Sequence, residues 1–364
     1  MEGDSEKENA GAQRFPVLRF LAREWMPAAS AWALALMVAV SGKLPRWSAS
    51  DFEVIFILFA LFTATKGLEE SGAFEALASA AGKGRLAAAK LTAAAWLLSM
   101  FVTNDAAVLV VVPLTLALPI RRKAAVVVLE VLAVNAGSAL TPVGNPQNLF
   151  IYWHYGLGVG EFVTAMLPLA AAFLLLLTPA AALLSGEERP AEARSRPLER
   201  KRSAVWFALL AVVVLAVAHV LPPAAAAAAP LWALAADRRA LKVDYLLLVA
   251  FFCLFGATDL LRELLRSGLQ EPQHVFALTA GLSQFMSNVP ATLLVADFTT
   301  DWKALAWGAN VGGFGWLMGS MASLIAWRIY ARARGDGGRF LLWFHVLGFA
   351  AFALGALLYL LAGG

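Results

Sequence analysis

Side chains that could bind an ion or a small solute gather in two short stretches of otherwise apolar sequence. The first is Thr103-Asn104-Asp105, and the second is LTPVGNPQNLFIYW at 140–153. Together they supply hydroxyls, a carboxylate and several amides, which can coordinate a cation or donate hydrogen bonds to an anion. The four histidines are scattered and there is one cysteine, so neither a transition-metal site nor thiol chemistry is indicated.

Two prolines and a glycine predict that a helix is interrupted within the second stretch. Pro142 and Pro146 cannot donate backbone hydrogen bonds, and Gly144 permits conformations that other residues avoid. A helix that starts near Ala124 is therefore expected to open at Thr141–Pro146. The freed carbonyls could coordinate cations, and the positive end of the helix resuming near Pro146 could face an anion.

The composition places this polar sequence inside a membrane. Of 364 residues, 60% are hydrophobic and 15% are charged, with a mean hydropathy of +0.71, whereas soluble domains have about 25% charged residues. Unpaired backbone groups have no partners in lipid, so the spanning segments are expected to be helices. The net charge is only +4, and nothing in its pattern indicates nucleic-acid binding.

The two halves of the chain resemble each other in three blocks that occur in the same order. The blocks pair FALFTATKGL at 59–68 with FCLFGATDLL at 252–261, SMFVTNDAAVL at 99–109 with SQFMSNVPATL at 283–293, and NAGSALTPVGNPQNL at 135–149 with NVGGFGWLMGSMASL at 310–324. Asn104 is thereby matched with Asn288, and Asn135 with Asn310. The sequence predicts an internal repeat.

Clusters of Lys and Arg mark cytoplasmic loops and orient the two halves. Residues 86–119 have basic residues on both flanks, which favours a re-entrant hairpin that enters from the cytoplasm and turns at Thr103–Asp105. Residues 273–298, turning at 287–290, have no such flanks, which favours entry from outside. The halves are therefore expected to cross the membrane in opposite senses, as inverted repeats do in secondary transporters.

We expect an all-α polytopic membrane protein with two inverted-topology repeats, each with a re-entrant hairpin and a broken helix, and about nine spanning helices plus the two hairpins. The N-terminus is expected in the cytoplasm, without a signal peptide, the C-terminus outside, and the chain in a bacterial-type cytoplasmic membrane. The expected parts are a cytoplasmic tail at 1–24, repeat 1 at 25–185 with its broken helix at 124–155, a charged cytoplasmic loop at 186–202, and repeat 2 at 203–364 with its broken helix at 303–327.

The motifs TNDAAVLVVVPLTLAL, GSALTPVGNPQNLFIY and SNVPATLL resemble those of a superfamily of citrate-transporter-like permeases. This superfamily includes arsenite permeases, NhaD-type sodium/proton antiporters and divalent anion/sodium symporters, and the resemblance covers roughly residues 25–362. It implies that the hairpin tips and the broken helices enclose the substrate and coupling ions, and that the protein forms a homodimer. The Thr-Asn-Asp tip is more similar to the arsenite-permease branch, and the short permeases of about this length are the most similar group.

Carried onto this chain, the resemblance implies a binding site that draws on both halves. The first half would contribute Thr103, Asn104, Asp105, Asn135, Gly137, Thr141, Gly144, Asn145 and Asn148. The second half would contribute Ser287, Asn288, Asn310, Gly312, Gly313 and Ser320. Asp105 and Val289-Pro290 depart from the symporter pattern, which puts sodium sites of the symporter type in doubt.

Two carboxylates lie in apolar sequence, where an ionisable group is a functional hypothesis by default. Asp105 could carry a proton or bind a cation, or it could cap the helix that runs from Ala106. Glu130 could relay protons, or it could pair with Arg121 or Lys123 near the cytoplasmic end.

The function that the sequence predicts is ion-coupled secondary transport of a small inorganic or organic anion by alternating access. The coupling ion would be Na⁺ or H⁺, and no cofactor is expected. The alternative is a sodium/proton antiporter that uses Asp105. A membrane-embedded enzyme is a remote third hypothesis, because neither an HExxH nor a GxSxG motif occurs.

Overall fold

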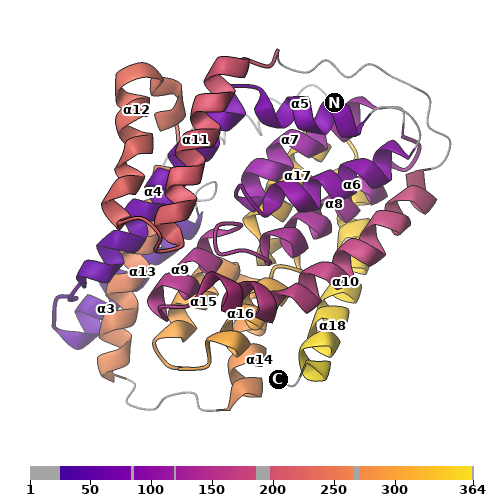
Figure 1. Ribbon diagram of the computed structural model, residues 1–364. Helices are drawn as coiled ribbons and strands as arrows, with labels where there is room; N and C mark the ends of the chain where they lie inside the picture. Colours follow the sequence, from indigo (N-terminus) through magenta and orange to yellow (C-terminus); the bar gives the residue numbers. More distant parts are fainter. Residues whose placement is uncertain (1–24, 83–85, 119, 186–196, 265–270, 363–364) are drawn as a thin grey trace, which may run out of the picture.

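The computed structural model describes residues 25–82, 86–118, 120–185, 197–264 and 271–362, and the described residues form helices and no strand (Figure 1). The predicted tail at 1–24 and most of the predicted loop at 186–202 lie outside the described residues. The first half contains α3 (Trp25–Ser41), α4 (Ala49–Glu70), α5 (Ala73–Ala81), α6 (Ala87–Ser99), α7 (Asn104–Ala117), α8 (Lys123–Ser138), α9 (Pro146–His154) and α10 (Val159–Ser185). The second half contains α11 (Arg200–Val217), α12 (Ala228–Ala236), α13 (Tyr245–Leu264), α14 (Pro272–Met286), α15 (Asn288–Ala296), α16 (Trp302–Val311), α17 (Met321–Arg334) and α18 (Gly337–Leu361), with short 3₁₀ helices at Pro223–Ala227, Arg238–Leu241 and Leu317–Gly319.

Three described segments are long and apolar enough to cross a membrane by length and composition: Val159–Leu184, Arg238–Arg262 and Gly337–Leu361. Large apolar side chains on them remain exposed, such as Leu175 at 73% and Leu183 at 83%, as expected for surfaces that contact lipid. About nine spanning helices were predicted. The remaining described helices are too short or too charged to meet the same criteria of length and composition, or they belong to a broken helix. A broken helix would cross in two pieces, so no single helix in it reaches spanning length.

Both predicted helix breaks are present. In the first half, the helix ends at Ser138 and resumes at Pro146, with Asn145 as the N-cap that accepts from the Asn148 amide. Proline at the first helical position is favoured, since its missing N–H would have had no partner there. In the second half, α16 ends at Val311 and α17 begins at Met321.

The second broken helix is longer than the predicted 303–327. It continues to Arg334, where Gly335 adopts a left-handed conformation with φ 67° and ends it. The basic cluster that was expected to form a loop is therefore largely helical, because Arg and Ala are good helix formers.

Both predicted hairpins are helix pairs. The first is α6 and α7, whose turn occupies residues 100–103, slightly before the predicted Thr103–Asp105. The second is α14 and α15, which turn at Ser287 with φ 72°. In Figure 1, α6 and α7 lie in the upper part of the molecule and α14 and α15 in the lower part. The membrane face from which each hairpin enters stays a prediction, as does the inverted repeat.

Candidate functional site

The tip of the first hairpin is hydrogen-bonded to the break in the first broken helix. The Asn104 backbone N–H donates to the Gly144 carbonyl at 3.1 Å, and the Thr141 hydroxyl donates to the Met100 carbonyl at 2.5 Å. The Asn104 side-chain amide lies 3.4 Å from the Asn135 oxygen. The structure therefore brings together two stretches that the sequence identified separately.

Asn148 satisfies the backbone that the break leaves unpaired. Its side-chain N–H groups donate to the carbonyls of Ser138, Ala139 and Thr141 at 3.1, 3.2 and 3.3 Å. Buried carbonyls without partners are costly, so this side chain stabilises the unwound segment as well as facing the second half.

The tip of the second hairpin lies close to the second break. A Cβ atom added to Gly313 would lie 3.2 Å from the Asn288 amide nitrogen, a tight contact, so glycine favours this close approach. A further side chain at this break, Gln284, was not predicted from the sequence. Its amide donates to the Gly312 carbonyl at 2.8 Å and its oxygen accepts from the Trp316 backbone at 2.7 Å. Its position three residues before Ser287, at the hairpin tip, was the feature of the sequence that could have indicated it.

The matched asparagines make reciprocal contacts across the two halves. The Asn135 oxygen accepts from Ser320 at 3.0 Å, and its amide nitrogen lies 3.5 Å from the Ser323 hydroxyl. Asn310 accepts from Asn145 at 3.1 Å and donates to Asn148 at 2.8 Å.

The ungapped match of 135–149 with 310–324 makes Ser320 the counterpart of Asn145, and Ser323 the counterpart of Asn148. Asn135 and Asn310 therefore each contact, in the opposite half, the two residues that occupy equivalent positions of the repeat. A reciprocal exchange of this kind is the pattern expected of two copies related by a two-fold axis.

Glycines permit close approach at matched places in the two halves. A Cβ atom on Gly137 would lie 2.1 Å from the Trp96 carbonyl oxygen, and one on Gly312 would lie 2.5 Å from Ser283 Cβ. A Cβ atom on Gly144 would likewise lie 2.3 Å from the Ser138 carbonyl oxygen. These glycines set the packing of helices and turns and offer no side chain to a ligand.

Asp105 lies at the start of α7, directly beside this cluster. The N-cap of α7 is Thr103 and not Asp105, and no side chain caps the helix. The Asp105 backbone N–H donates to Asn104 Oδ1 at 3.0 Å. Its Oδ1 atom is buried and has no hydrogen-bond partner among the described residues. An unpartnered carboxylate oxygen at this place is available to a proton or a cation.

Glu130 is not brought to the cluster. It is buried in α8, and its Oε1 accepts from the Thr115 hydroxyl of α7 at 2.5 Å, while Oε2 has no partner among the described residues. The predicted pairing with Arg121 or Lys123 is not what the structure shows, because Lys123 donates to the Leu116 carbonyl instead. Glu130 lies about 10 Å further along α8 than Lys123, and it accepts from α7 instead.

The cluster and the fold define a class of protein: an all-helical polytopic membrane transporter with polar helix breaks in each half. The chain belongs to the citrate transporter family, whose sequence model matches residues 19–312. It is 39% identical over 306 residues to the inner membrane protein YbiR of Escherichia coli strain K12, covering 78% of this chain and 81% of that protein.

Further relatives also carry transporter names. An uncharacterized transporter of Methanocaldococcus jannaschii is 31% identical over 268 residues, covering 67% of this chain and 71% of that protein. An uncharacterized transporter of Mycobacterium bovis is 27% identical over 339 residues, covering 78% and 79% of the two chains. These names indicate transporters rather than enzymes.

Proposed function

We propose that this protein is an ion-coupled secondary transporter of a small anion or oxyanion, working by alternating access at the cluster described above. The proposal rests on the reciprocal contacts of two asparagines. Asn135 of the first half contacts residues of the second half, and Asn310 of the second half contacts residues of the first. A solute held there would contact both halves at once, and a change in their relative placement would open the site to one face or the other.

An anion is favoured because four helices begin at this cluster. α7 and α15 start at the hairpin tips, and α9 and α17 start where the broken helices resume. A helix N-terminus carries a partial positive charge and unpaired N–H groups, both of which favour a negative ligand. The side-chain amides of Asn104 and Asn288 add neutral donors, so the site can hold an anion without a fixed cation.

A sodium/proton antiporter is the second candidate, and the unpartnered oxygen of Asp105 favours it. A single carboxylate could exchange Na⁺ for H⁺, with freed carbonyls near Gly144 completing a cation site. In the anion transporter, the same carboxylate could carry the coupling proton. The two functions therefore differ in which solute moves, not in where it binds.

Exchange and uptake by purified protein in proteoliposomes test both functions. A panel of arsenite, phosphate, sulfate, dicarboxylates and sodium would be offered with and without a pH gradient. Uptake of one anion, abolished in Asn310→Ala, would support anion transport. Proton-coupled sodium exchange, abolished in Asp105→Asn and retained in Glu161→Gln, would support the antiporter. Glu161 is the matched control because it is an exposed carboxylate on α10. No movement of any solute would overturn both.

The charge pattern also supports a cytoplasmic (inner) membrane with the N-terminus inside and the C-terminus outside. Arg121 and Arg122, before α8, line one cavity together with Arg334, at the end of α17, and Arg339, in the first turn of α18, so these residues lie on one face. The basic face of a membrane protein is the cytoplasmic one. A homodimer remains part of the proposal by analogy with the family.

A further inference from the structure

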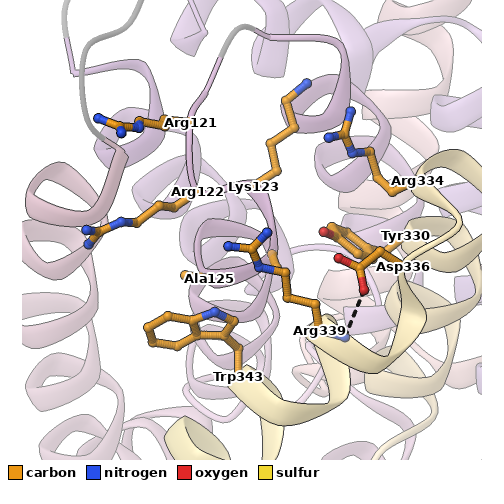
Figure 2. Close-up of a pocket in the computed structure, with 10 residues that line it drawn as sticks. Arg121, Arg122, Lys123, Ala125, Tyr330, Arg334, Asp336, Arg339 and Trp343 are labelled. Carbon is orange, nitrogen blue, oxygen red and sulfur yellow. Dashed lines mark hydrogen bonds between the residues drawn. The ribbon is translucent and has the colours of Figure 1, made fainter.

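Basic residues from three segments line a cavity outside the transport site. The cavity has a volume of about 240 Å³ and lies between the start of α8, the end of α17 and the start of α18 (Figure 2). Its charged lining comprises Arg121, Arg122, Lys123, Arg334, Asp336 and Arg339.

The positive charge of this cavity is poorly compensated. Asp336 is the one carboxylate among its described lining residues, and its Oδ1 already accepts from the Arg339 backbone N–H at the start of α18. Within the described ranges, no ion pair joins Arg121, Arg122 or Arg334 to a carboxylate. Like charges held together without a counter-ion repel one another, so a bound anion would relieve that repulsion.

The cavity also receives the positive end of α8. Arg122 occupies the N-cap position and makes no side-chain hydrogen bond to the first turn of the helix. Ala124 and Ala125, which are buried, line the cavity at that end. Backbone N–H groups that lack a cap and a helix dipole both favour a phosphate group at this place.

Orientation of the protein in the membrane requires basic residues in cytoplasmic loops, but it does not require that residues from separate segments line one cavity. On α17, Arg328 and Arg332 lie outside the lining of the cavity, whereas Arg334 is part of it. Trp343 of α18, which is half-buried, also lines the cavity, and tryptophan is enriched at the level of lipid headgroups. Basic pockets between helices on the cytoplasmic side suit such headgroups.

We propose that this cavity binds the phosphate group of an anionic ligand, supplied either by a phospholipid headgroup or by a soluble phosphate. The arginines of α17 and α18 and the start of α8 would hold the phosphate together. Because α8 belongs to the first half and α17 and α18 to the second, the ligand would link the halves in the arrangement seen here. The proposal does not depend on which solute the protein transports.

Two binding measurements on the full chain distinguish the sources. In the first, native mass spectrometry compares retention of phosphatidylglycerol and phosphatidylcholine from mixed vesicles. In the second, inorganic phosphate is titrated into protein in phosphatidylcholine nanodiscs, with potassium chloride as the salt control. Selective retention of phosphatidylglycerol assigns the site to lipid, and saturable phosphate binding assigns it to a soluble ligand.

The variant R334Q/R339Q should weaken the observed binding by about 25-fold, at about fivefold for each cation removed. The matched control R328Q/R332Q removes two charges from the same region outside the cavity and should leave binding within about twofold. The single variant R122Q, an exposed side chain, gives the same test with about a fivefold loss should the double variant fail to fold. No selective binding in either arm, or equal losses in the control, would overturn the proposal.

Discussion

Replacing Gly137 with alanine tests how the first hairpin is held against the broken helix. The new methyl carbon would lie 2.1 Å from the Trp96 carbonyl oxygen and 2.6 Å from Ser99 Oγ, whereas ordinary contact begins at 3.4 Å. The carbonyl belongs to the backbone of α6 and cannot rotate away. The two helices must therefore separate by roughly 1 Å in a core that is otherwise close-packed.

The expected cost follows from two opposing effects. Overpacking a core by one methyl group typically destabilises by about 1–3 kcal/mol, while alanine in place of glycine within a helix stabilises by about 0.5–1 kcal/mol. Because the obstructing atom is a backbone carbonyl oxygen, we expect overpacking in the upper part of its range, about 2–3 kcal/mol, and a net loss of about 1–2.5 kcal/mol for Gly137→Ala. Gly281→Ala, in α14, is the matched control, because a Cβ atom there would meet nothing within 4 Å. It should stabilise by about 0.5–1 kcal/mol.

Thermal unfolding measures this difference directly. Cys253 is the one cysteine of the chain and is buried, so a thiol-reactive fluorophore reports when the fold opens. Gly137→Ala should melt below the wild type and Gly281→Ala at or above it. Separation of α6 from α8 should also displace the hairpin tip and weaken the 3.1 Å bond from Asn104 to Gly144, so solute transport should fall with stability. A Gly137→Ala protein that melts and transports like the wild type would refute the close approach of these helices.

Two further predictions concern the buried polar groups. Asn135→Ala and Asn310→Ala should each destabilise the protein by about 1–3 kcal/mol, because each change leaves buried polar partners without a hydrogen bond. A comparison of melting temperatures with Thr164→Ala, at an exposed position, would show whether the loss is specific. Glu130→Gln keeps an oxygen to accept from the Thr115 hydroxyl and should leave the melting temperature nearly unchanged. If Glu130 relays protons, the same variant should lose the response of transport to a pH gradient, and an unchanged response would remove Glu130 from the mechanism.

Local signals in the sequence predicted the elements that form the site. Pro142, Gly144 and Pro146 predicted the first helix break, and the polar tips predicted both hairpins, because these residues restrict or free the backbone wherever they occur. The alignment of the halves predicted that Asn135 and Asn310 hold equivalent positions.

Contacts between segments that are distant in the sequence could not be predicted from it. No local pattern indicates that Asn135 bonds Ser320 rather than its own half, or that Gln284 supports the second break. The extent of the second broken helix was also mispredicted, because Arg328–Arg334 favours both a cytoplasmic loop by charge and a helix by propensity. Glu130 was assigned possible partners from its neighbours in sequence, whereas its partner, Thr115, lies on a neighbouring helix.

Cysteine accessibility at the two hairpin tips tests most directly whether both halves share one transport site. In a Cys253→Ala background, single cysteines at Thr103 and Ser287, both buried in this structure, would be exposed to a membrane-impermeant thiol reagent from each face of proteoliposomes. We expect each position to be modified from either face as the site alternates, and the transported solute to protect both positions. Modification of each tip from one face only, or protection of one tip without the other, would contradict it.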